Sequence, residues 1–350
     1  MNIAQQSGRW RQWVTQCKKR SGNKLPIVLH IGMEKTGSKS IQTWLADNRK
    51  NLAGEGWHIP TTLGAINHRQ VSFLGYDVTR RDDGTQRRGI YTDQQLKQFK
   101  KEILVRLKNE VQDARKNGAK AMLISTELAT SRLTKKREIR RLFKKLREAD
   151  AGPILVTLFR RDPVELLESR HSTAILHEGW TKAHPPKAGS KLANKFGDQK
   201  TLQKKWWEVI NKFNNIDFDV YNYSRKVLIE GSSAATVATM MGCRTTMIKT
   251  AVELKANQPL PLINLIGLRF SNWINQRKTP LSKEQNNRLK KFFLKNKILG
   301  RLKYKLPEVI RQSYRTAYKA SLMPAGDDWL LWSSWIQQQQ DTEVVQRGEQ

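Results

Sequence analysis

Four short apolar runs lie in the first two thirds of the chain, and polar residues or glycines bound each of them. Runs of this length and composition are typical of strands that are buried on both faces of a parallel sheet. The sequence therefore predicts four strands, at residues 24–32, 121–125, 154–159 and 216–221.

Between and after these runs, apolar residues recur every three or four positions, which is the period of an amphipathic helix. Ile41, Trp44 and Leu45 follow the first strand with this spacing, and Pro163 suits the first turn of another helix. Residues 179–200 are rich in lysine, glycine, proline and alanine, and we expect an exposed loop or a mobile flap there. The predicted helices cover residues 37–53, 94–117, 133–149, 163–177, 232–242 and most of 259–335.

Strands that alternate with helices predict an α/β protein, with a three-layer fold in which helices flank a central parallel sheet. The sequence contains no internal repeat and no evident linker. We therefore expect one domain over residues 25–335 and a disordered tail over residues 336–350.

The first 24 residues contain six lysines and arginines and no acid. Trp10, Trp13, Val14 and Cys17 recur at helical spacing, so residues 1–24 are predicted to form a basic amphipathic helix. We favour packing of its apolar face on the body of the protein, and the alternative is contact with an anionic membrane surface. An organellar transit peptide has the same acid-poor, amphipathic character.

Composition narrows the class of protein. Of 350 residues, 64 are lysine or arginine and 31 are aspartate or glutamate, which gives a net charge of +33. A hydrophobic content of 38% with 11 tryptophans excludes a disordered polycation. The charge favours a polyanionic partner, which leaves nucleic acid, anionic lipid, a charged polysaccharide and a multiply charged nucleotide as candidates.

The longest apolar run is far shorter than the about twenty residues that a membrane-spanning helix needs, so the sequence predicts none. Cys17 and Cys243 cannot form a disulfide framework, and no cysteine–histidine cluster has the spacing of a zinc site. We therefore expect a reducing, cytoplasmic location, with any membrane contact peripheral, and no metal.

The sharpest local pattern joins the first predicted strand to the first predicted helix: His30-Ile31-Gly32-Met33-Glu34-Lys35-Thr36-Gly37-Ser38-Lys39-Ser40. In such a junction, backbone N–H groups and the helix N-terminus can surround an anion. Gly37 permits the turn and Lys35 adds a point charge. The Walker A pattern G-x-x-x-x-G-K-[ST] is not met, because Ser38 follows the second glycine and Lys39 is displaced by one. The loop predicts phosphate binding, and the alternative is an ordinary turn with a surface lysine.

Lys35-Thr36-Gly37-Ser38, followed by Ile41-Gln42-Thr43-Trp44-Leu45, resembles the 5′-phosphosulfate loop of the sulfotransferases that use 3′-phosphoadenosine 5′-phosphosulfate (PAPS), most closely their bacterial carbohydrate-type branch. The resemblance implies a P-loop-like fold, PAPS as donor and adenosine 3′,5′-bisphosphate as product. In that family the lysine contacts the bridging oxygen of the phosphosulfate, and the residues after it bind the 5′-phosphate. The residues that inherit these roles are Lys35, Thr36, Gly37, Ser38 and Ser40. Lys39 stands where the family usually has threonine or serine, so only its backbone N–H is expected to bind.

A second family element is an arginine at a strand end with a serine eight residues later, which together bind the 3′-phosphate. Arg161 follows the third predicted strand, and Ser169 lies eight residues after it. A planar guanidinium and a hydroxyl two turns into a helix can meet on one phosphate. Arg160 is the neighbouring candidate. The structural alternative for Arg161 is an ion pair with Asp162 or another nearby acid.

Sulfuryl transfer to an alcohol or amine needs a base for the acceptor proton and a cation for the leaving phosphate. Lys35 suits the second task. Glu127 follows the second predicted strand, at the same sheet edge as the loop, and is the predicted base. His68, in Ile66-Asn67-His68-Arg69, is the second candidate, because histidine titrates near neutral pH. The alternative for Glu127 is a carboxylate that stabilises the dipole of the helix predicted at residues 133–149. The alternative for His68 is a loop residue without a role.

The leading hypothesis is a PAPS-dependent sulfotransferase that acts on a carbohydrate-type acceptor. A P-loop ATP-dependent phosphotransferase and a non-catalytic nucleic-acid-binding protein are the alternatives. Basic clusters at residues 132–147 and 277–305 support the nucleic-acid alternative, but apolar residues such as Leu289, Phe292 and Phe293 interleave them at helical spacing, as in a solvated helix around a core stripe. No nucleic-acid-reading motif is present. The few cations of the predicted donor site account for only a small part of the net positive charge. The remaining positive charge favours binding of an anionic glycan or glycolipid acceptor, or of an anionic membrane surface.

Overall fold

The computed structural model describes residues 7–253, 261–277, 281–295, 304–322, 330–334 and 337. Apart from residue 337, the predicted tail lies outside these residues. The chain divides into two compact units, of which the first comprises residues 1–160, 201–254 and 325–350 and the second comprises residues 161–200 and 255–324. The predicted single domain spans both units.

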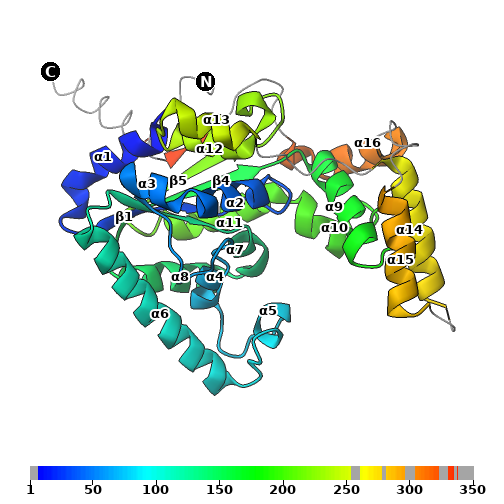
Figure 1. The fold of residues 1–350 in the computed structure, drawn as a ribbon, viewed down its shortest axis with the longest axis horizontal. Coiled ribbons are helices and arrows are strands. Elements are labelled where there is room, and N and C mark those ends of the chain that lie inside the picture. The colour runs from blue at the N-terminus through cyan, green and yellow to red at the C-terminus, as the bar shows by residue number, and fades with distance from the viewer. Residues whose placement is uncertain are drawn as a thin grey trace. The chain divides into compact units, whose positions relative to one another are not determined.

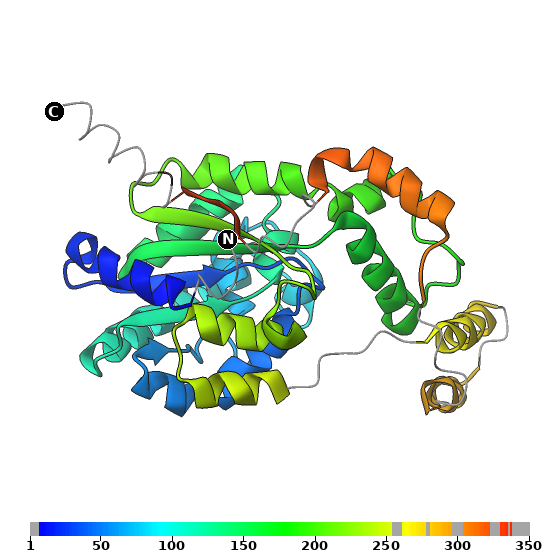
Figure 2. The same ribbon diagram turned by 90° about the horizontal axis from the view of Figure 1, so that it is seen from above.

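The first unit is built around a six-stranded sheet with helices on both of its faces (Figure 1, Figure 2). Its elements in chain order are α1 (Arg9–Ser21), β1 (Leu25–His30), α2 (Ser38–Asp47), α3 (Arg49–Gly54), β2 (Trp57–His58), α4 (Gln70–Gly75), α5 (Asp83–Gln86), α6 (Asp93–Lys116), β3 (Ala121–Ser125), α7 (Leu128–Arg132), α8 (Lys136–Glu148), β4 (Ala151–Arg160), most of α11 (Gln199–Ile210), β5 (Ile216–Asn222), the 3₁₀ turn η2 (Ile229–Gly231), α12 (Ser233–Met240), α13 (Thr245–Glu253) and β6 (Leu330–Ser333).

The strand order is β2-β3-β1-β4-β5-β6. The first five strands in this order are parallel, and β6 is antiparallel to β5. The four predicted strands are confirmed as β1, β3, β4 and β5. Two strands were not predicted: β2 has only two residues, and β6 lies where helix was expected. The sheet is therefore mixed rather than purely parallel, within the predicted three-layer α/β class.

Alternate residues of each central strand enter two different cores, as the period of a strand requires. Val28, Leu155 and Tyr221 belong to the buried cluster that includes residues of α1, α2, α12 and α13. Ile27 and Val156, which occupy the alternating positions, are also fully buried, and on that opposite face α8 packs against β4. Both faces of β1 and β4 are thus covered, which explains their continuous apolar sequence.

Helix α1 confirms the predicted N-terminal amphipathic helix. Trp10, Trp13 and Cys17 are fully buried in the same cluster, so the apolar face packs on the body of the protein. Polar groups fix it further: Trp13 Nε1 donates to Asp217 (2.7 Å), and the Arg9 guanidinium binds the fully buried Asp219 carboxylate (3.0 Å).

Two expectations about helices need correction. The predicted helix at residues 37–53 is divided into α2 and α3 at Asn48, whose side-chain Nδ2 donates to the carbonyl of Trp44 (2.9 Å). The predicted loop at residues 179–200 contains helix α10, because Ser190 caps its N-terminus with a hydrogen bond from the backbone N–H of Ala193.

The second unit is helical. Its elements are α9 (Pro163–His177), α10 (Lys191–Gly197), the start of α11, α14 (Leu262–Asn275), α15 (Lys283–Lys295), α16 (Glu308–Ala317) and the 3₁₀ turn η3 (Lys319–Ser321). Its small core joins α9 to α14 through Ile175, Leu265 and Leu268. Asp162 caps α9 by accepting from two backbone N–H groups, and Pro163 occupies the first turn as predicted.

Candidate active site

The loop between β1 and α2, residues 31–37, is held in place along its whole length. The backbone N–H of Ile31 donates to Thr157 (2.9 Å), and that of Met33 donates to Phe159 (3.1 Å), which extends the pairing with β4. The loop then turns back, because both the N–H and the hydroxyl of Thr36 donate to the carbonyl of Met33 (3.3 and 2.5 Å). We call this segment the phosphate loop, after the ligand that the sequence predicts for it.

Two residues of the phosphate loop have left-handed backbone conformations, Lys35 with φ of 69° and Gly37 with φ of 75°. Glycine adopts this conformation without strain, whereas a lysine there carries a cost that is typical of functional loops. A Cβ atom on Gly37 would lie 2.4 Å from Ser233 Oγ and 2.7 Å from Ser233 Cβ. Position 37 therefore requires glycine for both conformation and space.

The N-terminus of α2 faces this loop without a side-chain cap. Gly37 has no side chain to supply one, and the first turn contains no acid. The hydroxyl of Ser38 is buried and has no hydrogen-bond partner among the described residues. Lys39 is exposed, and Ser40 is partly exposed. Open backbone N–H groups, a positive dipole end and an orphaned buried hydroxyl suit an anion with oxygen atoms.

Glu127 lies beside the phosphate loop because β3 pairs with β1. The residue before it, Thr126, donates its backbone N–H to the carbonyl of His30 (2.9 Å). The hydroxyl of Thr130, one turn later, lies 3.3 Å from the carbonyl of Gly32. The end of β3 is thus hydrogen-bonded to the end of β1, and α7, which follows Glu127, is hydrogen-bonded to the loop that carries Lys35.

Two amide side chains hold the Glu127 carboxylate. Gln42 Nε2 donates to Oε2 (2.7 Å), and Asn67 Nδ2 lies 3.0 Å from Oε1 and 3.2 Å from Oε2. Asn67 is fixed in turn by the hydroxyl of Thr126, which donates to its Oδ1 (3.0 Å). Glu127 is the N-cap residue of the short helix α7, and its carboxylate makes no capping hydrogen bond to that helix. No role for Gln42 or Asn67 was predicted from the sequence.

His68 occupies a different position from the one expected of a base. It is fully buried, and its Nδ1 accepts the backbone N–H of Ser125 (2.9 Å). Burial lowers its pKa to about 4. His30 lies on the other side of Ser125, with its Nδ1 and the serine Oγ sharing a 2.8 Å hydrogen bond. This geometry favours a structural role for His68 at the end of β3.

The predicted 3′-phosphate residues, Arg161 and Ser169, belong to the second unit. Arg161 Nε contacts Glu165 Oε2 (3.2 Å). This contact is the ion pair with a nearby acid that was the alternative prediction for Arg161. Arg160 ends β4 in the first unit, where its guanidinium donates to Gln203 Oε1 (2.7 Å) and burial lowers its pKa to about 10. The role of Arg161 and Ser169 toward a 3′-phosphate stays a prediction.

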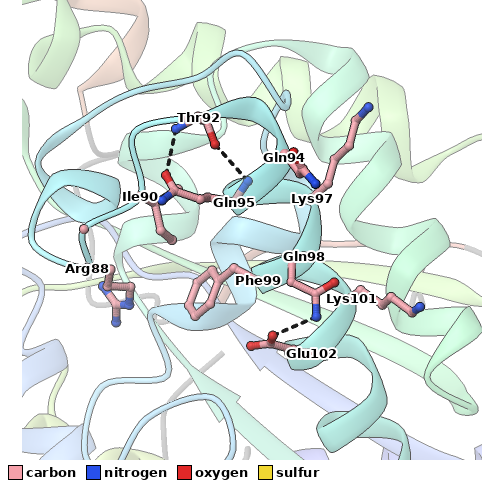
Figure 3. A pocket seen from close by; sticks show the side chains of 11 residues that line it. Arg88, Ile90, Thr92, Gln94, Gln95, Lys97, Gln98, Phe99, Lys101 and Glu102 are labelled. Atoms are coloured by element: carbon pink, nitrogen blue, oxygen red, sulfur yellow. Dashed lines mark hydrogen bonds between the residues drawn. The ribbon is translucent and has the colours of Figure 1, made fainter.

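A separate hollow of about 750 Å³ lies at the start of α6 (Figure 3). Most of the residues that line it have polar side chains, and some of these groups serve the helix itself: Gln95 Oε1 accepts the backbone N–H of Thr92 (2.9 Å), and Gln98 donates to Glu102 (2.9 Å). None of the predicted site residues lines it. The hollow therefore adds nothing to the candidate active site.

Within the part of the chain that the structure describes, no three histidine, cysteine, aspartate or glutamate side chains are grouped so as to hold a metal ion. Among the same residues, no helix is long and apolar enough to cross a membrane.

Comparisons with known proteins leave the family open. No protein-family model matches the chain, and no curated protein matches it significantly. A solved structure from the PezAT chromosomal toxin-antitoxin system of Streptococcus pneumoniae covers 70% of this chain and 90% of its own, with 15% identity and a TM-score of 0.27. A likeness of this size carries no argument about function.

Proposed function

We propose that the chain is a PAPS-dependent sulfotransferase that transfers a sulfuryl group to a hydroxyl or amine of a carbohydrate-type acceptor. One observation carries the proposal: Glu127, held by Gln42 and Asn67, follows β3 and precedes α7, and the Thr130 hydroxyl of α7 is hydrogen-bonded to Gly32 of the phosphate loop. An anion-binding loop beside an oriented carboxylate suits transfer of an anionic group to an acceptor that must lose a proton.

On the donor side, the residues present fit the 5′ end of PAPS. The hydroxyl of Ser38 and the N-terminal N–H groups of α2 can bind phosphate oxygens, and Gly37 allows close approach of the backbone. Lys35 is partly exposed on the same loop, where it can neutralise charge on the leaving phosphate. PAPS supplies the sulfuryl group when it is bound.

On the acceptor side, Glu127 takes the proton from the attacking hydroxyl or amine. A carboxylate has about four lone-pair positions, and the contacts from Gln42 and Asn67 occupy three of them among the described residues. One position therefore remains for the acceptor. The two amides also fix the carboxylate in one orientation, which reduces the cost of aligning it with an acceptor.

We propose a polyanionic acceptor, such as an acidic glycan or glycolipid. Its support is the net charge of +33 together with exposed cations on the first unit, among them Arg140 and Lys144 on α8 and Lys212 after α11. We also propose a cytoplasmic location, because Cys17 and Cys243 are both free thiols.

Nucleotide binding measured by calorimetry tests this function against its alternatives. We expect adenosine 3′,5′-bisphosphate to bind without added metal, and ATP with Mg²⁺ to bind more weakly. Preferential binding of ATP with Mg²⁺ would support a phosphotransferase instead. Nucleic-acid binding that survives high salt, without binding of the bisphosphate, would support the non-catalytic alternative.

A further inference from the structure

The second unit carries an exposed apolar stripe along α14. Ile263, Ile266, Phe270 and Trp273 follow one another at spacings of three and four residues, which places them in a line on one helix face. Their exposed fractions are 38, 49, 52 and 44%. The rings of Phe270 and Trp273 stack with centroids 5.9 Å apart. The stripe is a continuous apolar surface, unlike scattered single residues.

The other faces of α14 hold the second unit together. Toward α15, Asn264 Nδ2 donates to the carbonyl of Phe293 (2.6 Å), and Ser271 Oγ donates to Asn286 Oδ1 (2.8 Å). Toward α9, Asn272 Nδ2 donates to a backbone carbonyl of that helix (2.7 Å). These contacts build the unit without using the exposed stripe.

Helix α15 adds an aromatic residue to the same side. The two hydrogen bonds between α14 and α15 pair early residues of one helix with late residues of the other, so the helices are antiparallel. Each residue of an α-helix is rotated by about 100° about the helix axis from the one before it. With α14 and α15 paired in this way, Phe292 lies on the side of the hairpin that carries Phe270 and Trp273. Phe292 is 60% exposed, so it does not belong to the core stripe that the sequence predicted.

Positive charge accompanies this apolar surface. The sequence from Leu262 to Lys295 contains eight lysines and arginines and one acid, Glu284. The Arg277 guanidinium lies over the Trp273 ring, 3.6 Å from its centroid. Arg277 therefore borders the aromatic stripe directly.

We propose that the α14–α15 hairpin docks on an anionic membrane surface, with Phe270, Trp273 and Phe292 in the lipid interface. An apolar helix face with aromatic residues and a border of lysine and arginine is the pattern of interfacial helices. Anionic headgroups complement the charge, whereas a second copy of this chain would bring two strongly basic surfaces together. Helix α1 cannot supply this contact, because its apolar face is buried. The proposal does not depend on the sulfotransferase activity.

Co-sedimentation of the full-length protein with lipid vesicles tests this inference. We expect binding to vesicles of phosphatidylcholine mixed with phosphatidylglycerol, and little binding to phosphatidylcholine alone. The variant Phe270→Ser/Trp273→Ser should partition at least about tenfold more weakly, because two aromatic side chains no longer enter the interface. Tyr91→Ser, which removes an exposed aromatic from the first unit, should bind like the wild type. Equal binding by the double variant and the wild type would overturn the proposal.

Charge-reversal variants separate a local site from the overall charge. Arg277→Glu/Lys291→Glu on the hairpin should weaken binding more than Arg106→Glu/Lys108→Glu on α6, where both residues are exposed, although both variants change the net charge equally. Equal losses would show attraction by net charge alone and would overturn the proposal. It also fails if sedimentation velocity shows a dimer that Phe270→Ser/Trp273→Ser dissociates, because the stripe is then covered by a second copy.

Discussion

Replacement of Gly37 by alanine tests whether the phosphate loop is as tightly constrained as its geometry indicates. The new Cβ would lie 2.4 Å from Ser233 Oγ, 2.7 Å from Ser233 Cβ and 2.9 Å from Tyr223 Cε2. Carbon atoms prefer separations of about 3.5–4.0 Å. Rotation of the serine can move its hydroxyl but not its Cβ, so relief requires movement of the backbone at the start of α12.

The expected cost has two parts. Alanine in the left-handed conformation costs about 1 kcal/mol relative to glycine, and overpacking typically adds about 1–3 kcal/mol. We therefore expect Gly37→Ala to lower the free energy of unfolding by about 2–4 kcal/mol. Urea denaturation measures this value, and the affinity for adenosine 3′,5′-bisphosphate should fall at least about tenfold as the loop shifts.

Gly118→Ala is the matched control. Gly118 has a similar φ of 80°, but nothing lies within 4 Å of an added Cβ. It should show the conformational cost alone, about 1 kcal/mol. If the two variants lose the same stability within about 0.5 kcal/mol, crowding against Ser233 is absent in solution and the described loop packing is wrong.

Three further predictions concern buried charge, catalysis and pH. Arg9→Ala should lower the free energy of unfolding by about 3–5 kcal/mol, because it leaves the Asp219 carboxylate buried without its cation, although the Tyr221 hydroxyl still donates to it; a loss below about 1 kcal/mol in urea denaturation would contradict this. Glu127→Gln should reduce kcat for sulfuryl transfer about 10²–10⁴-fold and leave bisphosphate affinity unchanged in calorimetry; retention of wild-type kcat would exclude it as the base. Burial lowers the pKa values of His30 and His68 to about 3 and about 4, respectively. Below about pH 6.5 the unfolded chain therefore binds more protons than the folded protein. The free energy of unfolding should consequently fall as the pH drops from about 6.5 to 4. Denaturation across this range should show a shallower slope for His68→Asn, by up to about 1.4 kcal/mol per pH unit, and an unchanged slope would contradict the burial of His68.

The sequence predicted the central strands because their burial on both faces leaves a continuous apolar run. It did not predict β2, since two residues cannot show a period. It also assigned Leu330–Ser333 to a helical region, because pairing with β5 is a contact between segments far apart in the chain. The packing of α1 was foreseen, since Trp10 and Trp13 share a helix face with Cys17.

The candidate site was predictable only where its residues are contiguous. The phosphate loop is one unbroken pattern, and Glu127 follows from its position at a strand end. Gln42 and Asn67 were missed because their contacts with Glu127 span 85 and 60 residues. The amide of Gln42, on a buried helix position beside apolar neighbours, was the available signal, since a buried amide needs a polar partner. The sequence also does not reveal that the ring of His68 is buried and accepts the backbone N–H of Ser125.

Transfer of labelled sulfuryl groups from PAPS tests the central claim most directly. Purified wild-type protein, Lys35→Ala and Lys50→Ala should be compared over a panel of neutral and anionic glycans. Lys50 is an exposed lysine on α3, outside the phosphate loop, and serves as the control. We expect transfer to at least one anionic glycan by the wild type and Lys50→Ala, with near-complete loss in Lys35→Ala. Equal transfer by Lys35→Ala and the wild type, or no binding of PAPS by any of the three proteins, would contradict the proposed function.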